Sequence, residues 1–261
     1  MNGRILTLAA VLIILPSGLR MCNAAPPAGT PWKMTFSGEF PRQDVALRKW
    51  TVKSRSPPDR SEAEVLRDNV EIDNGMCRLL ARKGDDGRTW KTPQLIGTGF
   101  EQRYGYFEAR IKISKTTGLA NVFALIDRDK ATDRMRRFWV EVVNAHYPST
   151  YLTRVRMPDG QRSFSDKNHP TAVDLSKDYH LYGLEWNDEE LIWYFDDREV
   201  RRLSHTLLRH PARIQLVIGV DGHGGKATEV PELPAMQVDY VRVYKKLDRP
   251  PKLSDWHDGM Q

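Results

Sequence analysis

The chain has 261 residues, of which 40% are hydrophobic and 28% are charged, and its formal net charge at pH 7 is +6. A chain of this length forms one large domain or two small ones, and all-β domains of roughly 200 to 250 residues are commonly single. The basic residues are spread along the whole sequence without a basic run interleaved with aromatic residues, so we expect no nucleic-acid partner.

The N-terminal residues 1–25 have the layout of a secretory signal peptide. Arg4 is followed by the apolar run Ile5–Leu15, and the segment ends in Ala24 and Ala25. The apolar run is too short to span a bilayer. We therefore expect no transmembrane span, and a protein that is secreted or located in the periplasm or at the cell surface. Removal of the leader takes away two arginines and lowers the net charge from +6 to +4.

Cleavage of the signal peptide would also determine which of the two cysteines remains in the mature chain. Cys22 lies in the leader, so the mature chain would keep Cys77 alone, and one thiol cannot form an internal disulfide. A lipoprotein anchor through Cys22 is the weaker alternative, because Leu19–Met21 lack the small residue that such processing prefers. We therefore expect the hydrophobic core to stabilise the fold without help from a disulfide.

The sequence pattern of the remainder of the chain predicts an all-β fold. Short β-branched and aromatic runs are separated by Gly, Pro, Asn and Asp, with one short helix candidate at Ser204 to Arg209. This many strands in one domain predict two packed sheets, a jelly-roll sandwich. The predicted strands, in chain order, are residues 70–72, 77–82, 106–113, 120–126, 138–144, 150–157, 179–186, 191–195, 213–220 and 236–244.

Turn residues join several of these strands into hairpins. Asp73-Asn74-Gly75 and Asp196-Asp197 each separate two predicted strands, and Asn, Asp and Gly are the residues that tight hairpin turns prefer. Within the strand at 106–113, Tyr106, Glu108 and Arg110 alternate with apolar residues. We expect the apolar face of this strand in the core and its polar face on a concave sheet that meets a ligand.

Four segments, taken together, resemble glycoside hydrolase family 16 in their order and spacing. The resemblance covers roughly Trp32 to Tyr244. It implies a concanavalin-like β-jelly-roll sandwich of two curved antiparallel sheets, spanning residues 26–246 and followed by a C-terminal tail at residues 247–261. The four segments are Phe36 to Phe40 with Lys49-Trp50, Tyr104 to Lys112 with Gly118-Leu119, Tyr182 to Trp186 with Ile192 to Asp197, and Met236 to Tyr244.

The resemblance also implies a chemistry, namely retaining hydrolysis of β-glucans or of galactans such as agar and carrageenan. That reaction uses two carboxyl groups about 5 to 5.5 Å apart. The family mounts them on one strand as Glu-x-Asp-x-x-Glu, where a β-bulge keeps the last Glu on the same face. Matched to this pattern, the chain has Trp139 at the nucleophile position, Glu141 at the middle Asp, and Asn144 at the acid/base position.

Two of these replacements remove the groups that the reaction needs. An indole cannot attack an anomeric carbon, and a carboxamide does not titrate near neutral pH. We therefore predict a pseudoenzyme that binds a polysaccharide. The predicted ligand contacts are Trp90, which is expected in a flanking loop, together with Trp139, Glu141, Asn144 and His146. Trp139 is also expected to fill space left by the small Ala124 on the neighbouring strand.

Two alternatives stay open at this point. An active retaining endo-glycosidase would hydrolyse O-glycosyl bonds of a β-glucan or galactan with Glu141 as the surviving acid and a second group supplied by a loop or by the substrate. A register shift that makes Glu141 the nucleophile would instead require His146 as the proton donor. A surface or structural protein would instead have its cleft closed by Trp139. No required cofactor is expected in any of the three readings, and a monomer is expected.

A structural calcium is a further implication of the resemblance. The family positions map to Glu39, a backbone carbonyl near Gly75, and Asp239. Oxygen ligands of this kind suit Ca²⁺. However, Gly38 stands where the family more usually has an Asp, so the candidate set is smaller by one carboxylate.

Overall fold

The computed structural model describes residues 26–53, 63–65, 67–87, 89–128, 135–156, 165–206, 208–220, 226–227 and 233–248. The predicted leader at 1–25 and residues 249–261 of the predicted tail lie outside the described residues. Within the described part, no helix is long and apolar enough to cross a membrane.

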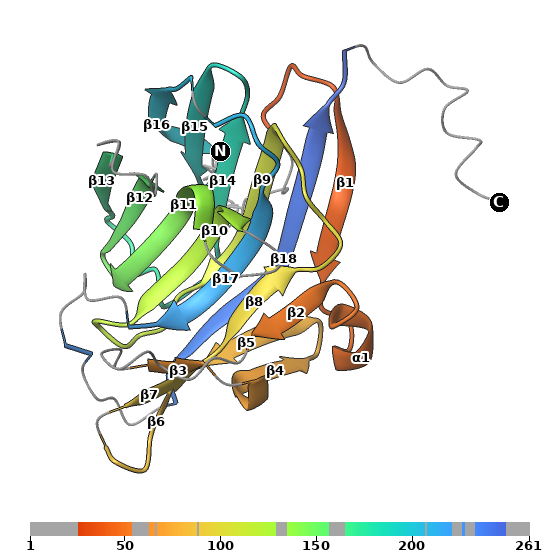
Figure 1. Cartoon of the computed structure of the whole chain (residues 1–261). Coiled ribbons are helices and arrows are strands. Elements are labelled where there is room, and N and C mark those ends of the chain that lie inside the picture. The colour runs from red at the N-terminus through yellow and green to blue at the C-terminus, as the bar shows by residue number, and fades with distance from the viewer. Residues whose placement is uncertain are drawn as a thin grey trace, which may run out of the picture.

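Two antiparallel sheets pack face to face (Figure 1). The first has the strand order β16 (Arg198–Ser204), β15 (Glu190–Phe195), β14 (His180–Trp186), β9 (Gly105–Lys112), β18 (Ala235–Lys246), β5 (Met76–Leu80) and β4 (Val70–Asp73), with β1 (Trp32–Glu39) also paired to β18. The second has the order β13 (Ser165–Pro170), β12 (Thr150–Arg156), β11 (Met135–Tyr147), β10 (Ala120–Arg128), β17 (Arg213–Gly219), β8 (Gln94–Gly97) and β2 (Trp50–Lys53). The fold is therefore the predicted all-β jelly-roll sandwich.

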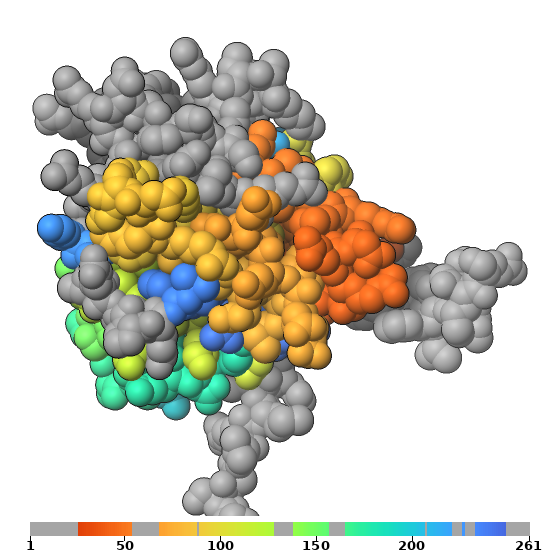
Figure 2. Space-filling model, turned by 90° about the horizontal axis from the view of Figure 1, so that it is seen from below, coloured from red at the N-terminus to blue at the C-terminus, as the bar shows by residue number. Residues whose placement is uncertain are grey.

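A small third sheet lies at one end of the sandwich. It consists of β3 (Ala63–Val65), β7 (Trp90–Thr92) and β6 (Arg82–Lys83), and its β3–β7 pair is parallel. Two short helices, α1 (Gln43–Ala46) and the 3₁₀ turn η1 (Arg67–Asn69), belong to the same part of the chain. Figure 2 shows this end from below, where orange and yellow atoms of the segment from α1 to β7 cover much of the surface.

The core between the two large sheets is filled by aromatic and aliphatic side chains. Trp186, Trp193, Phe107 and Phe138 are 0–1% exposed. Fully burying one large apolar side chain contributes roughly 1.5–3 kcal/mol relative to exposure. Trp186 lies among several aromatic neighbours, with Phe138 edge-on at a centroid distance of 5.5 Å. Because Phe138 comes from β11 and Trp186 from β14, this contact fixes the two sheets against each other.

All the strands predicted from alternation are present, with ends that shift by one to three residues. Both predicted hairpin turns are also confirmed, since Asn74, Gly75, Asp196 and Asp197 all have positive φ. The predicted helix at 204–209 is wrong among the described residues of that segment. Ser204 instead ends β16, and the described residues that follow it contain no helix.

The prediction for the polar face of β9 is also wrong. Its apolar face lies in the core as expected, but β9 belongs to the eight-stranded sheet and not to the sheet that carries β11. Tyr106 and Glu108 therefore point away from the predicted site. Tyr106 lies over Gly183 of β14, where an added Cβ would come within 2.3 Å of the tyrosine oxygen. A glycine at this position lets the tyrosine ring lie flat against the strand.

Candidate functional site

Strand β11 contains a β-bulge at the predicted catalytic positions. Ala124 of β10 pairs with Glu141, whereas its neighbour Phe123 pairs with Val143, so β11 has one extra residue between them. A second register shift against β12 falls between Glu141 and Asn144. An extra residue of this kind changes the alternation and returns Asn144 to the face of Glu141. The bulge inferred from the residue spacing is therefore present.

The outer face of the seven-stranded sheet carries all three positions. Trp139, Glu141 and Asn144 pair with Ile126, Ala124 and Val122 respectively, and these three β10 residues alternate along one face. Within the same row across the sheet, Glu141 pairs with Arg154 of β12, and Arg154 pairs with Asp166 of β13. The register thus places one cation between two carboxylates.

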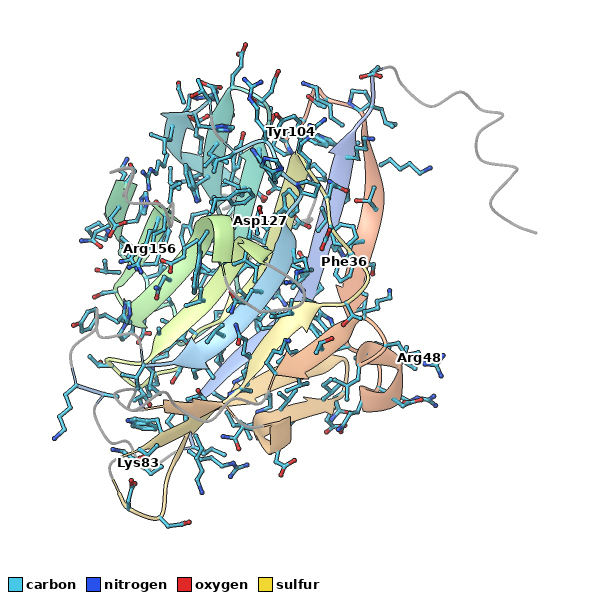
Figure 3. All side chains as sticks on the ribbon, in the orientation of Figure 1. Phe36, Arg48, Lys83, Tyr104, Asp127 and Arg156 are labelled. Atoms are coloured by element: carbon cyan, nitrogen blue, oxygen red, sulfur yellow. The ribbon has the colours of Figure 1, made fainter. Side chains whose placement is uncertain are left out.

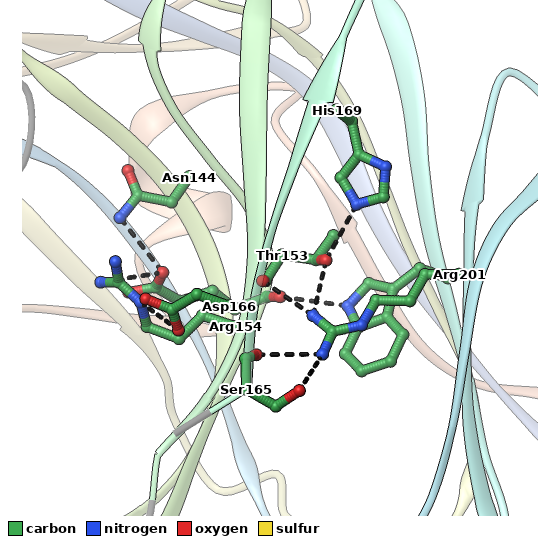
Figure 4. A network of polar contacts seen from close by, with 9 residues as sticks. Asn144, Thr153, Arg154, Ser165, Asp166, His169 and Arg201 are labelled. Atoms are coloured by element: carbon green, nitrogen blue, oxygen red, sulfur yellow. Dashed lines mark hydrogen bonds and ion pairs between the residues drawn. The ribbon is translucent and has the colours of Figure 1, made fainter. Parts of the chain in front are cut away.

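The Glu141 carboxylate is held by its neighbours (Figure 4). Asn144 Nδ2 donates to Glu141 Oε2 at 3.1 Å, and Arg154 Nη1 lies 3.5 Å from the same oxygen. Arg154 Nε donates to Asp166 Oδ1 at 3.0 Å. The side chains of Arg154 and Glu141 are only 2% and 4% exposed, whereas that of Asp166 is 44% exposed. Glu141 therefore belongs to a buried ion pair. Removing either partner of such a pair destabilises the fold, because the other charge stays buried without compensation.

The backbone of the bulge is fixed from the opposite sheet. Trp193 Nε1, on β15, donates to the Glu141 carbonyl at 3.1 Å. The Arg201 guanidinium of β16 lies 4.6 Å from the Trp193 ring centre and donates to the Thr153 carbonyl and to Ser165. Figure 4 draws the contacts of Arg201 with Thr153 and Ser165 as dashed lines. Burial lowers the pKa of Arg201, since it removes water from the charged guanidinium. The hydrogen bonds to Thr153 and Ser165 replace part of that lost solvation.

Trp139 forms part of the floor of this face. Its side chain is half-buried and packs against a cluster of small and branched residues on β8 and β10. Ala124, which is fully buried, lies in this cluster, in agreement with the expectation that a large residue covers a small one. The buried members of the cluster are Ile96, Ala120, Val122, Ala124 and Ile126. The centre of the face is therefore apolar and largely filled.

A groove of about 450 Å³ lies to one side of this floor, over β11, β12 and β13. We call it the β11–β13 groove. Asn144 and His146 of the predicted contacts line it, and His146 is 7% exposed. Glu141 lies beside it, bonded to the lining residues Asn144 and Arg154. The full lining is Asn144, His146, Tyr147, Thr150, Tyr151, Leu152, Arg154, Asp166 and Asn168.

The expectation for Trp90 needs correction. Trp90 does not lie in a flanking loop but begins strand β7, where it is 4% exposed and belongs to the main core cluster. The Lys83 ammonium lies 4.6 Å from the centre of its ring. A ring buried in this way presents no face for stacking on a sugar, so its position gives no support to the predicted binding role.

Each of the two predicted carboxylate ligands of calcium is paired with an arginine. Gly75 forms a β-bridge with Phe40, which places it next to Glu39. However, Glu39 Oε1 accepts from Arg242 Nε at 2.8 Å, and Asp239 Oδ2 accepts from Arg110 at 2.7 Å. No cluster of three or more His, Cys, Asp or Glu side chains suited to a metal occurs in the described ranges. An arginine thus already neutralises each carboxylate.

We therefore expect calcium to have little effect on stability. Addition of CaCl₂ or of a chelator should change Tm by less than about 2 °C, because a ligand stabilises only in proportion to its binding to the folded state. Differential scanning calorimetry of the purified protein measures this directly. A rise of Tm that grows with calcium concentration, and that Glu39→Gln abolishes, would show that the ion displaces the arginines.

The sequence interpretation missed Arg154, Asp166 and Tyr147. Arg154 and Asp166 matter because the register sets them beside Glu141. Tyr147, at the end of β11, is 42% exposed and lines the β11–β13 groove. The sequence did contain one signal for its exposure. Tyr147 lies just before the turn at Pro148-Ser149, and turns lie at the surface. Figure 3 shows the side chains on this sheet, including Arg156 of β12.

Comparison with known proteins identifies related chains. A model of the glycosyl hydrolases family 16 matches residues 59–240. An endo-1,3-1,4-beta-glycanase of Rhizobium meliloti is 30% identical over 167 residues, covering 61% of this chain and 33% of the relative. A beta-glucanase of Fibrobacter succinogenes is 28% identical over 156 residues, covering 56% and 44% respectively. The chain thus spans a third to less than half of the length of these curated relatives.

Solved structures agree with the fold. An endo-beta-1,3-glucanase from Pyrococcus furiosus matches with a TM-score of 0.75 and 22% identity, covering 85% of this chain and 98% of that one. The laminarinase catalytic domain from Thermotoga maritima matches with a TM-score of 0.71 and 22% identity, covering 84% and 100%. At this level of identity the likeness concerns the sandwich itself and not the side chains of the site.

Proposed function

The chain belongs to glycosyl hydrolase family 16, and on that premise we propose that it is a secreted polysaccharide-binding protein without effective hydrolytic activity. One relative is named an endo-1,3-1,4-beta-glycanase and the other a beta-glucanase, which supports a glucan as the ligand. The signal-peptide pattern at residues 1–25 supports export. The proposed binding surface is the β11–β13 groove together with the exposed part of Trp139.

One observation carries this proposal: of the three catalytic positions, only Glu141 has a carboxyl group, and Asn144 and Arg154 hold that group in place. The nearest acid in the same row is Asp166, two strands away. Two strand spacings separate their backbones by roughly 9 to 10 Å, and Arg154 binds both carboxylates. Retaining hydrolysis uses two carboxyl groups that face the anomeric carbon. Here one arginine binds both described acids of this row, which supports a structural role for them rather than a catalytic one.

A specific observation favours the second candidate, an endo-glycosidase that uses Glu141. Arg154, 3.5 Å away, attracts the ionised form of the carboxylate, which is the form that a nucleophile needs. His146 lines the adjacent groove and would have to donate the proton. This alternative predicts a measurable activity that Glu141→Gln abolishes, whereas the binding proposal predicts no activity to lose.

The two candidates are separated by measuring binding and cleavage on the same preparations. Purified protein is tested against soluble β-1,3-glucan, mixed-linkage β-glucan, agarose, porphyran and carrageenan, by affinity electrophoresis and by reducing-end release. We expect retarded migration in at least one glucan and no release above a heat-denatured blank. Dose-dependent release would establish the hydrolase instead.

The Tyr147 ring is expected to contribute a stacking face for a sugar. It is 42% exposed at the rim of a groove that both polar and apolar side chains line, an arrangement typical of sites that bind amphipathic ligands. Tyr147→Ala should weaken glucan binding about 10-fold, because a contact of this size is worth roughly 1.4 kcal/mol. Tyr147→Phe should keep most of the affinity. Isothermal titration calorimetry measures both variants.

A matched control is available for this variant. Met34 of β1 is 45% exposed on the other sheet, so Met34→Ala removes a similar exposed apolar side chain away from the groove. Its affinity should equal that of the wild type. If Tyr147→Ala and Met34→Ala bind equally well, Tyr147 is not part of the binding surface.

A further inference from the structure

A second groove, of about 1070 Å³, lies at the open edge of the sandwich. It runs between β13, the edge strand of the seven-stranded sheet, and the hairpin of β15 and β16, which forms the edge of the other sheet. We call it the edge groove. Its lining includes Lys167, His169, Val173, Phe195, Asp196 and Arg198. None of these side chains belongs to the predicted catalytic strand, so the edge groove is a separate feature of the fold.

The edge groove adjoins the β11–β13 groove. Tyr151 and Asn168 line both of them. Asn168 lies on β13 with its side chain exposed, directly opposite Leu152 of β12. Because β13 is the last strand of its sheet, a ligand chain that follows the first groove past Asn168 reaches the edge groove without crossing another strand.

Unpaired polar atoms lie beside the shared wall. Tyr151 Oη, Tyr182 Oη and His180 Nε2 are buried, and none has a hydrogen-bond partner among the described residues. Tyr151 is 3% exposed, and its ring meets Tyr182 edge-on at 5.6 Å. Buried polar groups without a partner are rare and costly, and their presence points to a ligand or water that satisfies them. Of these residues only Tyr151 lines the two grooves. A phenol both donates and accepts, as a sugar hydroxyl does, so a polyhydroxylated ligand that reaches the Tyr151 hydroxyl would satisfy it.

The walls of the edge groove are held rigidly. His169 stacks on Tyr151 at 4.8 Å, and Phe195 stacks on the Tyr151 and His180 rings at 5.2 Å each. Asp196 accepts from His180 at 2.8 Å and from the Leu181 amide at 2.9 Å. A groove whose side chains are already ordered loses less conformational entropy when a ligand binds.

The two rims are also joined across the edge. Lys167 Nζ of β13 donates to the Val200 carbonyl of β16 at 3.2 Å. Arg198 is exposed on the opposite rim, at the start of β16. Two cationic side chains, each a strong hydrogen-bond donor, thus line a groove that would accept the oxygen atoms of a glycan.

From this geometry we infer that the bound polysaccharide leaves the face of the seven-stranded sheet at Asn168 and continues into the edge groove. The inference depends on the proposed function, and it adds a second region that recognises the same glycan chain. A ligand long enough to reach both grooves gains contacts that a short one lacks. Long oligosaccharides therefore bind more tightly than short ones, and the edge groove is the source of the difference.

The test uses β-1,3-linked gluco-oligosaccharides as the probe, a trisaccharide and a decasaccharide, with titration calorimetry on the full mature chain. We expect the wild type to bind the decasaccharide at least ~10-fold more tightly than the trisaccharide, which corresponds to roughly one charge-assisted hydrogen bond. Lys167→Ala/Arg198→Ala should lose that difference and keep its affinity for the trisaccharide. Lys33→Ala/Lys245→Ala removes the same charge from exposed positions on β1 and β18, outside the edge groove, and should behave as the wild type.

A second variant keeps the test independent of charge. Tyr151→Phe removes one unpaired hydroxyl without changing the ring, so it should fold with unchanged or higher Tm and bind the decasaccharide more weakly. If the affinity rises from the trisaccharide to the decasaccharide by the same factor in the wild type and in Lys167→Ala/Arg198→Ala, the inference is overturned. Absence of binding to either oligosaccharide and to every polysaccharide probe would overturn the proposed function itself, which is a different result.

Discussion

Arg154→Met should lower the free energy of unfolding by about 3–5 kcal/mol, because it leaves Glu141 as a buried carboxylate without its cation. Both side chains are nearly inaccessible, at 2% and 4% exposure. Asn144 still donates a hydrogen bond to Glu141, but a neutral donor does not replace the ion pair. Urea unfolding followed by intrinsic fluorescence measures the change, since Trp193 donates to the Glu141 carbonyl and reports on this part of the core.

The double variant Glu141→Gln/Arg154→Met separates the buried charge from general loss of packing. Without the carboxylate there is no unpaired charge, so the double variant should recover most of the lost stability. Asp166→Asn serves as a further control, because Asp166 is 44% exposed and its pair with Arg154 is screened by solvent. If the double variant is less stable than Arg154→Met, the unpaired charge of Glu141 is not the main cause of the stability lost in Arg154→Met.

Glu108→Gln should remove most of the pH dependence of stability between pH 4.5 and about 7. Burial raises the pKa of Glu108 from 4.5 to about 7, against the opposing effect of Arg242. Between these two values the folded state binds more protons than the unfolded state, so stability falls as pH rises. At 1.36 kcal/mol for each pKa unit, the wild type should lose about 3 kcal/mol across this window.

The expected signature is specific to that residue. Above pH 7, Glu108→Gln should be more stable than the wild type by about the same 3 kcal/mol, and near pH 4.5 the two should be similar. Glu189→Gln, at an exposed position in the turn before β15, should leave the pH profile unchanged. Denaturant unfolding at a series of pH values gives the profile. A wild-type protein whose stability rises from pH 4.5 to 7 would show that other groups outweigh Glu108.

The strands were predictable because strand alternation is a local property of the sequence. Residues 106–113 and 213–220, for example, show it clearly, and both became strands. The bulge in β11 was also predictable, because six residues from Trp139 to Asn144 return to one face only if one residue is extra. The helix expected at 204–209 failed because β16 pairs with β15 as far as Ser204, so tertiary pairing outweighed local propensity.

The partners of Glu141 were not predictable. They depend on the register between β11, β12 and β13, and each bulge shifts that register by one residue. Arg154 and Asp166 therefore could not be placed beside Glu141 from spacing alone. The sheet to which β9 belongs was undetermined for a related reason, since alternation shows which face is apolar but not which sheet contains the strand. Trp90 was misplaced because β7 is only three residues long and has no alternation to detect.

The most direct test of the central claim is the fate of a defined β-1,3-linked hexasaccharide and its mixed-linkage counterpart, each incubated with excess protein and followed by mass spectrometry. The claim is that Asn144 and Arg154 hold the single carboxyl of Glu141 in a structural role. It predicts intact hexasaccharide with the wild type and with Glu141→Gln, at the level of a protein-free blank. Shorter oligosaccharides that appear with the wild type and disappear with Glu141→Gln would contradict the claim and identify Glu141 as a catalytic residue.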